Sequence, residues 1–282
     1  MNFYNVIPGQ GSLALITERY QPDRGMGMTL YLVEGESRAA LIDSGMGVAQ
    51  NLRQIVEGLT DKPVDCILTH GHPDHAGAAT LFDKVYMNEG DVPLLPVSLS
   101  PERRLGDVEH STNNDPEIMA FCRANYVDCS GFTFENFENG HIFDLGGVQL
   151  EAVHVPGHTA GSMALLNREE NYVLLGDAVN PRTALVASFG DGSVLRRYRD
   201  GIQYLCANIN GDTRVYTGHS VEPMDHAILY DMAQAAQEVI DGKRENDVPS
   251  QSMFAKRIEA SGKRMFEHTC GKVILVYNAN EL

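Results

Sequence analysis

Four side chains that can bind a metal are crowded into one short segment of the sequence. The segment 69–77 reads Thr-His-Gly-His-Pro-Asp-His-Ala-Gly and contains His70, His72, Asp74 and His75. Imidazole nitrogens and carboxylate oxygens are the ligands that zinc and other first-row divalent cations accept in proteins. One histidine alone would ordinarily be a surface or core residue, but four donors at this spacing favour a metal site.

Three further donors follow apolar runs later in the chain. His158 lies in Val-Pro-Gly-His-Thr-Ala-Gly-Ser (155–162), Asp177 follows Tyr-Val-Leu-Leu-Gly, and His219 follows Arg-Val-Tyr-Thr-Gly. Each residue alone is equally compatible with a polar residue that caps a loop. Because each leaves the end of a separate predicted strand, all three can converge with the first segment at one edge of a sheet. Their joint occurrence favours a shared site.

The elements that must position these donors are indicated by short apolar runs between turn residues. Two runs, 29–33 and 39–42, are separated by Glu-Gly-Glu-Ser and predict a hairpin. A helix near 47–59, strands at 64–69 and 85–87, and a second series of strands follow: 142–143, 148–150, 152–155, 163–166, 172–175 and 215–216. Helices are also predicted at 115–126 and 223–241, and a last strand at 272–277. This alternation predicts an α/β protein.

Residues 91–140 interrupt the two series of strands. They show little sheet character, and Asp115-Pro116 is a typical helix start. We therefore expect a helical insertion or lid here, which could also form the surface of a homodimer. No Ser/Gly-rich linker divides the chain, so the sequence predicts a single domain over residues 1–282.

Composition and charge restrict the class of partner. The formal charge is −16, which disfavours nucleic acid because phosphate binding depends on Lys and Arg. No apolar run approaches the roughly twenty residues that cross a bilayer, and no basic amphipathic helix suggests membrane-surface binding. The five cysteines include no CxxC pair, and no secretory signal is visible. We therefore expect a cytoplasmic enzyme that acts on a small molecule.

The ordered set His-x-His-x-Asp-His, Pro-Gly-His-Thr-x-Gly-Ser, Gly-Asp and Gly-His resembles the metallo-β-lactamase superfamily. Leu-Ile-Asp-Ser-Gly at 41–45 is similar to the first motif of that family, and the matching positions run from about 30 to 220. The resemblance implies an α/β fold, an αββα four-layer sandwich of two mixed β-sheets flanked by helices. It also implies a two-metal site along one edge of the sandwich.

The resemblance further implies a role for each donor. Two sets of three ligands and one bridge are expected: His70, His72 and His158 for the first metal, Asp74, His75 and His219 for the second, and Asp177 between them. Asp43 would orient ligands by hydrogen bonds without touching a metal. Two divalent ions, with zinc expected and iron or manganese also compatible, can lower the pKa of a shared water and supply hydroxide. Asp74 can then hold the proton and pass it to the leaving group.

Asp177 separates this chain from the antibiotic-degrading branch, which typically has Cys or Ser at that position. The resemblance therefore favours lactonase-like or glyoxalase II-like members, with hydrolysis of an ester, thioester or lactone bond. Three alternatives stay open: phosphodiesterase or β-lactamase activity, a non-catalytic binding module, and a mononuclear iron oxidoreductase of the persulfide dioxygenase kind. The last would use His70, His158 and Asp177 for one iron.

Some residues near the expected site are candidates for substrate contact. Residues 20–28 would form a flap over the metals, with Arg24, Met26 and Met28 as candidates for substrate contact, and a plain hairpin loop is the alternative. Asn180, three residues after Asp177, is a candidate to stabilise an oxyanion. The identity of the substrate cannot be predicted from the sequence of the loops that determine specificity.

Overall fold

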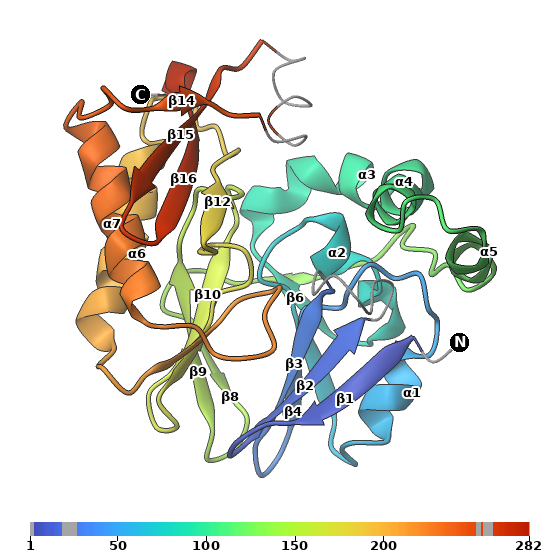
Figure 1. The fold of residues 1–282 in the computed structure, drawn as a ribbon. Coiled ribbons are helices and arrows are strands. Elements are labelled where there is room, and N and C mark those ends of the chain that lie inside the picture. Colours follow the sequence, from blue (N-terminus) through green and yellow to red (C-terminus); the bar gives the residue numbers. More distant parts are fainter. Residues whose placement is uncertain (1–2, 19–26, 252–254, 256–261, 282) are drawn as a thin grey trace.

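The structure is a computed structural model that describes residues 3–18, 27–251, 255 and 262–281. Two sheets lie face to face in its centre, with helices on the outer face of each (Figure 1). Both sheets contain parallel and antiparallel pairs. The expected sandwich of two mixed sheets flanked by helices is therefore confirmed.

The first sheet has the strand order β1-β2-β3-β4-β5-β6-β7. Its strands are β1 (Tyr4–Pro8), β2 (Leu13–Glu18), β3 (Thr29–Glu34), β4 (Ala39–Ile42), β5 (Val64–Ile67), β6 (Val85–Met87) and β7 (Glu135–Asn136). The strands from β1 to β4 pair antiparallel, and those from β4 to β7 pair parallel. The predicted hairpin of β3 and β4 is confirmed, whereas the pair β1 and β2 was not expected from the sequence.

The second sheet has the order β13-β11-β10-β9-β8. Its strands are β8 (Ile142–Asp144), β9 (Gln149–His154), β10 (Met163–Asn167), β11 (Tyr172–Leu174) and β13 (Arg214–Tyr216). Gly146 and Gly147 both have positive φ in the turn between β8 and β9, as the Gly-Gly pair predicts. The expected runs 148–150 and 152–155 form the single strand β9, and the other four strands end within one residue of the expected ranges.

A third sheet of four strands, in the order β12-β16-β15-β14, was not predicted as a sheet. Its strands are β12 (Arg182–Ala184), β14 (Val248–Pro249), β15 (Met265–Cys270) and β16 (Val273–Asn278). Only β16 was expected, because its apolar run is continuous. In β15 the polar residues Glu267, His268 and Thr269 interrupt the apolar run, and this weakens the signal.

The helices form two groups. The first covers the outer face of the β1–β7 sheet or joins its strands: α1 (Leu52–Glu57), α2 (Pro73–Ala76), η1 (Ala79–Leu81), η2 (Glu89–Leu94), α3 (Leu95–Ser98), α4 (Pro101–Ser111) and α5 (Pro116–Ala124). The second comprises α6 (Val194–Asn208) and α7 (Ala227–Ile240), which cover the other sheet, and η3 (Ala279–Glu281) follows β16 (Figure 1). In the described part of the chain, no helix is long and apolar enough to cross a membrane.

Consecutive strand residues show why four layers are needed. Leu41 and Ile42 in β4 are both fully buried, yet they belong to different apolar clusters. Successive side chains of a strand point to opposite faces, so one cluster lies under the helices and the other lies between the sheets. Val173 and Leu174 divide in the same way on the second sheet. Each sheet is therefore covered on both faces.

Two helix predictions need correction or extension. The helix expected at 47–59 begins only at Leu52, because Gly45 and Gly47 have positive φ and lie in a loop. The region 91–140 is mainly helical as expected, but α4 was not foreseen. Helix α5 begins at Pro116, with the Asp115 side chain accepting from the backbone N–H groups of Glu117 and Ile118.

Candidate metal centre

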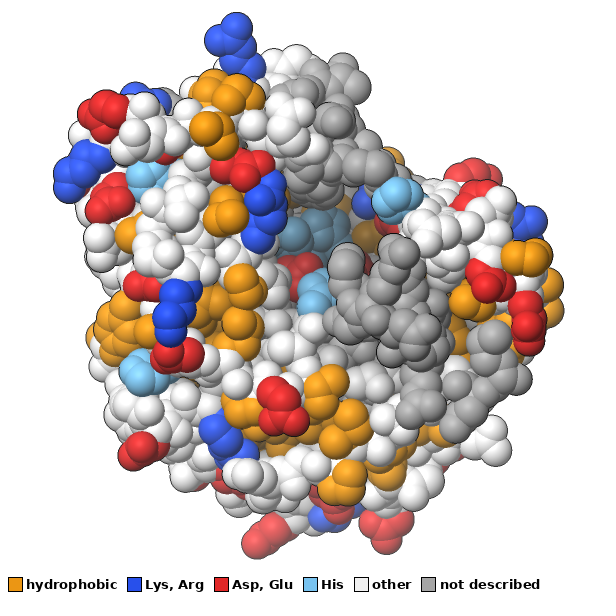
Figure 2. Space-filling view, viewed as in Figure 1, with side chains coloured by type: hydrophobic (Ala, Val, Ile, Leu, Met, Phe, Trp, Pro, Cys, Tyr) orange, Lys and Arg blue, Asp and Glu red, His pale blue; other side chains and the backbone are white. Residues whose placement is uncertain are grey.

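The candidate residues leave the ends of strands that meet at one edge of the sandwich. His70 follows β5, His158 follows β9, Asp177 follows β11, and His219 follows β13. His72 precedes α2, and this short helix carries Asp74 and His75. Figure 2 shows histidine and acidic side chains gathered in a hollow of this face. The structure therefore brings all seven candidate ligands together.

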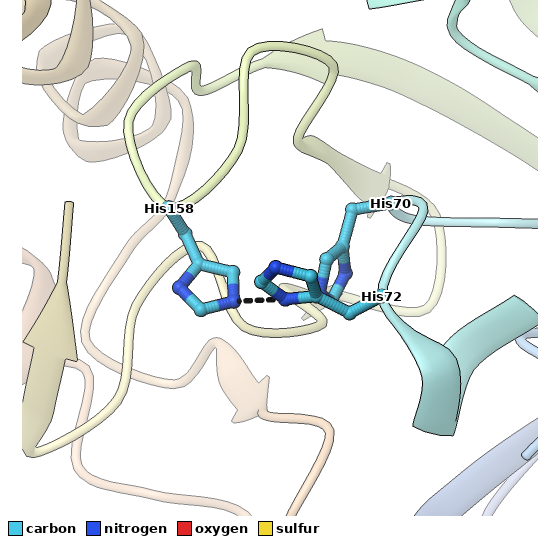
Figure 3. Close-up of side chains that lie close together, drawn as sticks. All are labelled: His70, His72 and His158. Atoms are coloured by element: carbon cyan, nitrogen blue, oxygen red, sulfur yellow. Dashed lines mark hydrogen bonds between the residues drawn. The ribbon is translucent and has the colours of Figure 1, made fainter. Parts of the chain in front are cut away.

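The first group consists of three histidines whose ring nitrogens face one another (Figure 3). Nε2 of His70 lies 3.1 Å from Nδ1 of His72, and Nε2 of His158 lies 2.9 Å from the same atom. Backbone and side-chain acceptors fix two of the rings from behind. Nδ1 of His158 donates to the carbonyl oxygen of Ala184. Nδ1 of His70 lies 3.1 Å from the hydroxyl oxygen of Thr69.

Burial keeps two of these imidazoles neutral, those of His70 and His72. Burial and the neighbouring histidines hold the pKa of both His70 and His72 well below the ordinary value. A neutral imidazole that donates from one nitrogen presents a lone pair at the other. If all three rings direct a lone pair inward, the lone pairs repel one another unless a cation lies between them. The group therefore has the chemistry of a three-nitrogen metal site.

The second group contains Asp74, His75 and His219. An oxygen of Asp74 lies 3.9 Å from Nε2 of His75 and 3.7 Å from Nε2 of His219. Oδ2 of Asp177 lies 3.7 Å from Nε2 of His75 and 3.2 Å from Nε2 of His219. It also lies 3.7 Å from Nε2 of His158, which belongs to the first group. Asp177 therefore stands between the two groups.

His75 gives a test of whether these residues fit a metal. Its Nδ1 donates to Asp43 over 2.8 Å, and its side chain is fully buried. Its Nε2 is buried with no hydrogen-bond partner among the described residues. A buried polar nitrogen without a partner is costly unless something else satisfies it. A cation between Asp74, His75 and His219 would do so, and the set of one oxygen and two nitrogens suits a divalent ion.

The carboxylates dominate the electrostatics of this second group. The charge of Asp177 raises the pKa of His219 to about 9. The pKa of His75 is held well above its ordinary value because the carboxylates of Asp43, Asp74 and Asp177 outweigh the effect of burial. Burial acts to raise the pKa of Asp177, but the charges of His219 and His75 hold it well below its ordinary value. Without a metal, protons therefore occupy positions that a cation would take.

Two glycines explain the Gly-Asp and Gly-His patterns. A Cβ on Gly176 would lie 2.3 Å from the hydroxyl oxygen of Thr69, and Gly176 has a φ of +51°. A Cβ on Gly218 would lie 2.8 Å from Cε1 of His75 and 3.0 Å from Oδ1 of Asp177. The chain therefore needs glycine before Asp177 and before His219 because their strands end so close to the histidines.

Asp91 is a buried residue at the site that the sequence did not indicate. Its carboxylate accepts hydrogen bonds from Gly71 N, Gly161 N and the Thr159 hydroxyl, each at 2.7 Å. It thereby joins the His70–His72 loop to the loop that carries His158. Asp91 lies at the start of the region read as an insertion, where no motif marks it. Only its neighbours in space reveal its role.

Two of the expected substrate contacts are not supported. Met28 is fully buried in the core beneath the helices, so its expected contact with substrate is wrong. The side chain of Asn180 donates to Oδ1 of Asp177 over 3.2 Å, so Asn180 orients a carboxylate and does not stand free to bind an oxyanion. Arg24 and Met26 lie outside the described residues.

Comparison with known sequences gives consistent matches. A family model described as "Metallo-beta-lactamase superfamily" matches residues 29–245. The acyl-coenzyme A thioesterase MBLAC2 of Gallus gallus is 30% identical over 58% of this chain and 61% of its own length. The hydroxyacylglutathione hydrolase GloC of Haemophilus influenzae is 30% identical over 52% of this chain and 63% of its own length. The chain thus spans somewhat under two thirds of these two relatives.

Solved structures agree on the fold. A beta-lactamase domain protein from Burkholderia ambifaria matches 86% of this chain and 76% of its own, with a TM-score of 0.59 and 18% identity. A metallo-beta-lactamase from Pontibacter korlensis matches 83% of this chain and 99% of its own, with a TM-score of 0.54 and 18% identity. At these identities the similarity supports the architecture alone.

Proposed function

Because this chain belongs to the metallo-beta-lactamase superfamily, we propose that it is a metal-dependent hydrolase with two divalent cations. His70, His72 and His158 would hold the first, and Asp74, His75 and His219 the second, with Asp177 shared between them. The bond attacked is an ester, thioester or lactone of a small molecule. The thioesterase and the hydroxyacylglutathione hydrolase named above are relatives that support this class of substrate.

One observation carries the proposal of two metals. The buried Nε2 of His75 has no hydrogen-bond partner among the described residues, and it faces Asp74 and Asp177. A one-metal site built on His70, His158 and Asp177 would leave this nitrogen unsatisfied. A second cation accounts for it, and Asp43 holds the ring in the orientation that the second cation requires.

The bound cations would lower the pKa of a water molecule and so supply a nucleophile at neutral pH. The chain's own residues supply position and proton transfer. Asp74 is partly exposed at the site, so its carboxylate can take the proton of the attacking water and return it to the leaving group. Asn180 donates a hydrogen bond to Oδ1 of Asp177 and so holds its carboxylate in place.

Metal analysis combined with a substrate panel tests this function. Purified protein should contain about two transition-metal ions per chain, and removal of the metal by a chelator should abolish activity. The panel comprises thioesters, lactones, aryl esters and phosphodiesters. Chelator-resistant turnover would contradict the proposal. One iron per chain together with oxygen-dependent oxidation of a persulfide would establish the oxidoreductase alternative instead.

A further inference from the structure

A pocket of about 480 Å³ lies beside the candidate metal centre, within the segment that joins β6 to β7. Its lining includes Val92, Leu95 and Leu99, together with the loop 128–132, which ends in Phe132. Most of these side chains are apolar, and Val92 is 45% exposed. The pocket is therefore an apolar surface that the fold itself leaves open.

Two residues attach this pocket to the histidine loops. Asp91, which immediately precedes Val92, accepts hydrogen bonds from Gly71 N and Gly161 N. Cδ2 of Leu95 lies 3.4 Å from the position that a Cβ on Gly71 would occupy. Gly71 lies between the two histidines of the His-x-His motif. The segment that lines the pocket is thus fixed to both histidine loops, and Leu95 in its wall lies next to Gly71.

The charges of the lining select the kind of ligand. Asp128 is the charged residue of the lining, and hydrogen bonds from the backbone N–H and hydroxyl of Ser130 lower its pKa. Its negative charge disfavours an anionic group, and among the described residues no Lys or Arg lines the pocket to attract one. Apolar surface in a pocket of this size instead favours a hydrocarbon group, which gains free energy by leaving water.

We propose that this pocket receives the apolar acyl chain of the substrate while the carbonyl carbon lies at the metal centre. The inference rests on the proposed hydrolase function and deepens it, because it makes medium-chain acyl thioesters or esters the preferred substrate class. The leaving-group side of the substrate then extends away from the segment 91–132. The chain's insertion is thereby a specificity element and not only a cover.

A chain-length series of thioesters on metal-loaded protein tests the assignment. From acetyl to octanoyl, kcat/KM of the wild type should rise by about two- to four-fold per methylene until the pocket is filled. Val92→Trp should fill the pocket and reduce kcat/KM for octanoyl thioester about ten-fold or more, with the acetyl thioester little changed. Val97→Trp is the matched control, because Val97 lies on α3, is 64% exposed and is not part of the lining.

A binding measurement gives a readout without turnover. The probe is the thioether analogue of the octanoyl thioester, in which a methylene replaces the carbonyl. Calorimetry should show that Val92→Trp weakens its binding about ten-fold, while Val97→Trp leaves it unchanged.

The outcomes separate this inference from the function on which it rests. Hydrolysis that is equally fast for all chain lengths, or equally affected by both tryptophan variants, would overturn the pocket assignment and leave the hydrolase function standing. Absence of hydrolysis for every thioester and ester would overturn the function. Binding of the thioether analogue that ignores Val92→Trp would independently remove the pocket from substrate recognition.

Discussion

Nδ1 of His75 donates a hydrogen bond to Oδ2 of Asp43 over a distance of 2.8 Å. The other oxygen of Asp43 accepts from the backbone N–H of Thr69 at 2.7 Å. Asp43 itself has a φ of +63°, a conformation that Asp tolerates better than most residues. The end of β4 thus fixes both the end of β5 and the ring of His75. This contact leaves Nε2 of His75 as the only nitrogen of the ring that can face the candidate metal centre.

Replacing Asp43 by Asn should weaken metal binding without removing any candidate ligand. The variant loses the negative charge that holds Nδ1–H of His75, and comparable changes beside metal sites cost about 10- to 100-fold in affinity. Competition with a fluorescent chelator measures the affinity. Asp144→Asn, at the exposed end of β8, is the control and should bind metal like the wild type. Equal affinities in both variants would show that Asp43 does not orient His75 for a metal.

A pair of variants distinguishes a site with two metals from a site with one. Asp177→Asn removes the negative charge that lies between the two groups of ligands. It should lower the metal content, and it should reduce turnover by a factor that corresponds to several kcal/mol. His75→Ala should have a comparable effect on the second metal. Metal analysis and turnover of the same preparations are the measurements. If Asp177→Asn is crippled while His75→Ala keeps wild-type activity, the site holds a single metal.

The motif residues could be predicted from the sequence because their chemistry is local. Four donors within one short segment, with three more at strand ends, are typical of a shared metal site. Asp91 could not be found in this way, because its partners Gly71, Thr159 and Gly161 are 20 to 70 positions distant. A single acidic residue in a polar segment has no distinguishing pattern.

The limits of fold prediction have a similar physical origin. Strands such as β4 and β11, buried on both faces, appear as continuous apolar runs. Strands β1 and β15 are partly exposed, and polar residues interrupt their apolar runs: Asn5 in β1, and Glu267 to Thr269 in β15. Helix α4 buries Arg104, whose guanidinium donates to the carbonyl oxygens of Met46, Gly47 and Gly77. Because a charged residue occupies a buried position of this helix, the spacing of apolar residues does not predict the helix.

Asp91→Ala should destabilise the protein and lower its metal affinity together. The change leaves the backbone N–H groups of Gly71 and Gly161 without their acceptor, whereas the hydroxyl of Thr159 still has Ser162 as a partner. Each unsatisfied buried donor costs about 1–3 kcal/mol, so we expect a loss of at least about 2 kcal/mol in the free energy of unfolding. Urea unfolding of the metal-free protein measures it. A stability within about 0.5 kcal/mol of the wild type would show that Asp91 does not connect the two loops.

Metal binding should release protons in the neutral range. The charge of Asp177 raises the pKa of His219 to about 9, so His219 carries a proton at pH 7 that a cation must displace. Apparent affinity for the second metal should therefore increase as pH rises from 7 to about 9. Calorimetry in buffers of different ionisation enthalpy counts the protons released. His219→Asn should reduce the number by about one, and an affinity independent of pH would contradict this protonation state.

Glu18 should make the metal-free protein less stable as pH rises. Burial raises the pKa of this carboxyl from 4.5 to about 8, and its Oε2 has no hydrogen-bond partner among the described residues. Between these two values the folded state holds a proton that the unfolded state has lost. The free energy of unfolding must therefore decrease as pH rises from about 4.5 to 8, by an amount of up to a few kcal/mol, and become level above that range.

A neutral replacement isolates this contribution. Glu18→Gln keeps an oxygen that can accept the N–H of Met46, as Oε1 of Glu18 does at 3.0 Å, but it cannot ionise. The decrease in stability between pH 5.5 and pH 8 should be smaller in Glu18→Gln than in the wild type, as measured by urea unfolding of the chelator-treated protein. Glu36→Gln, at an exposed position, should retain the wild-type decrease. If Glu18→Gln and Glu36→Gln lose the same stability over this range, Glu18 is ionised in the folded protein at neutral pH.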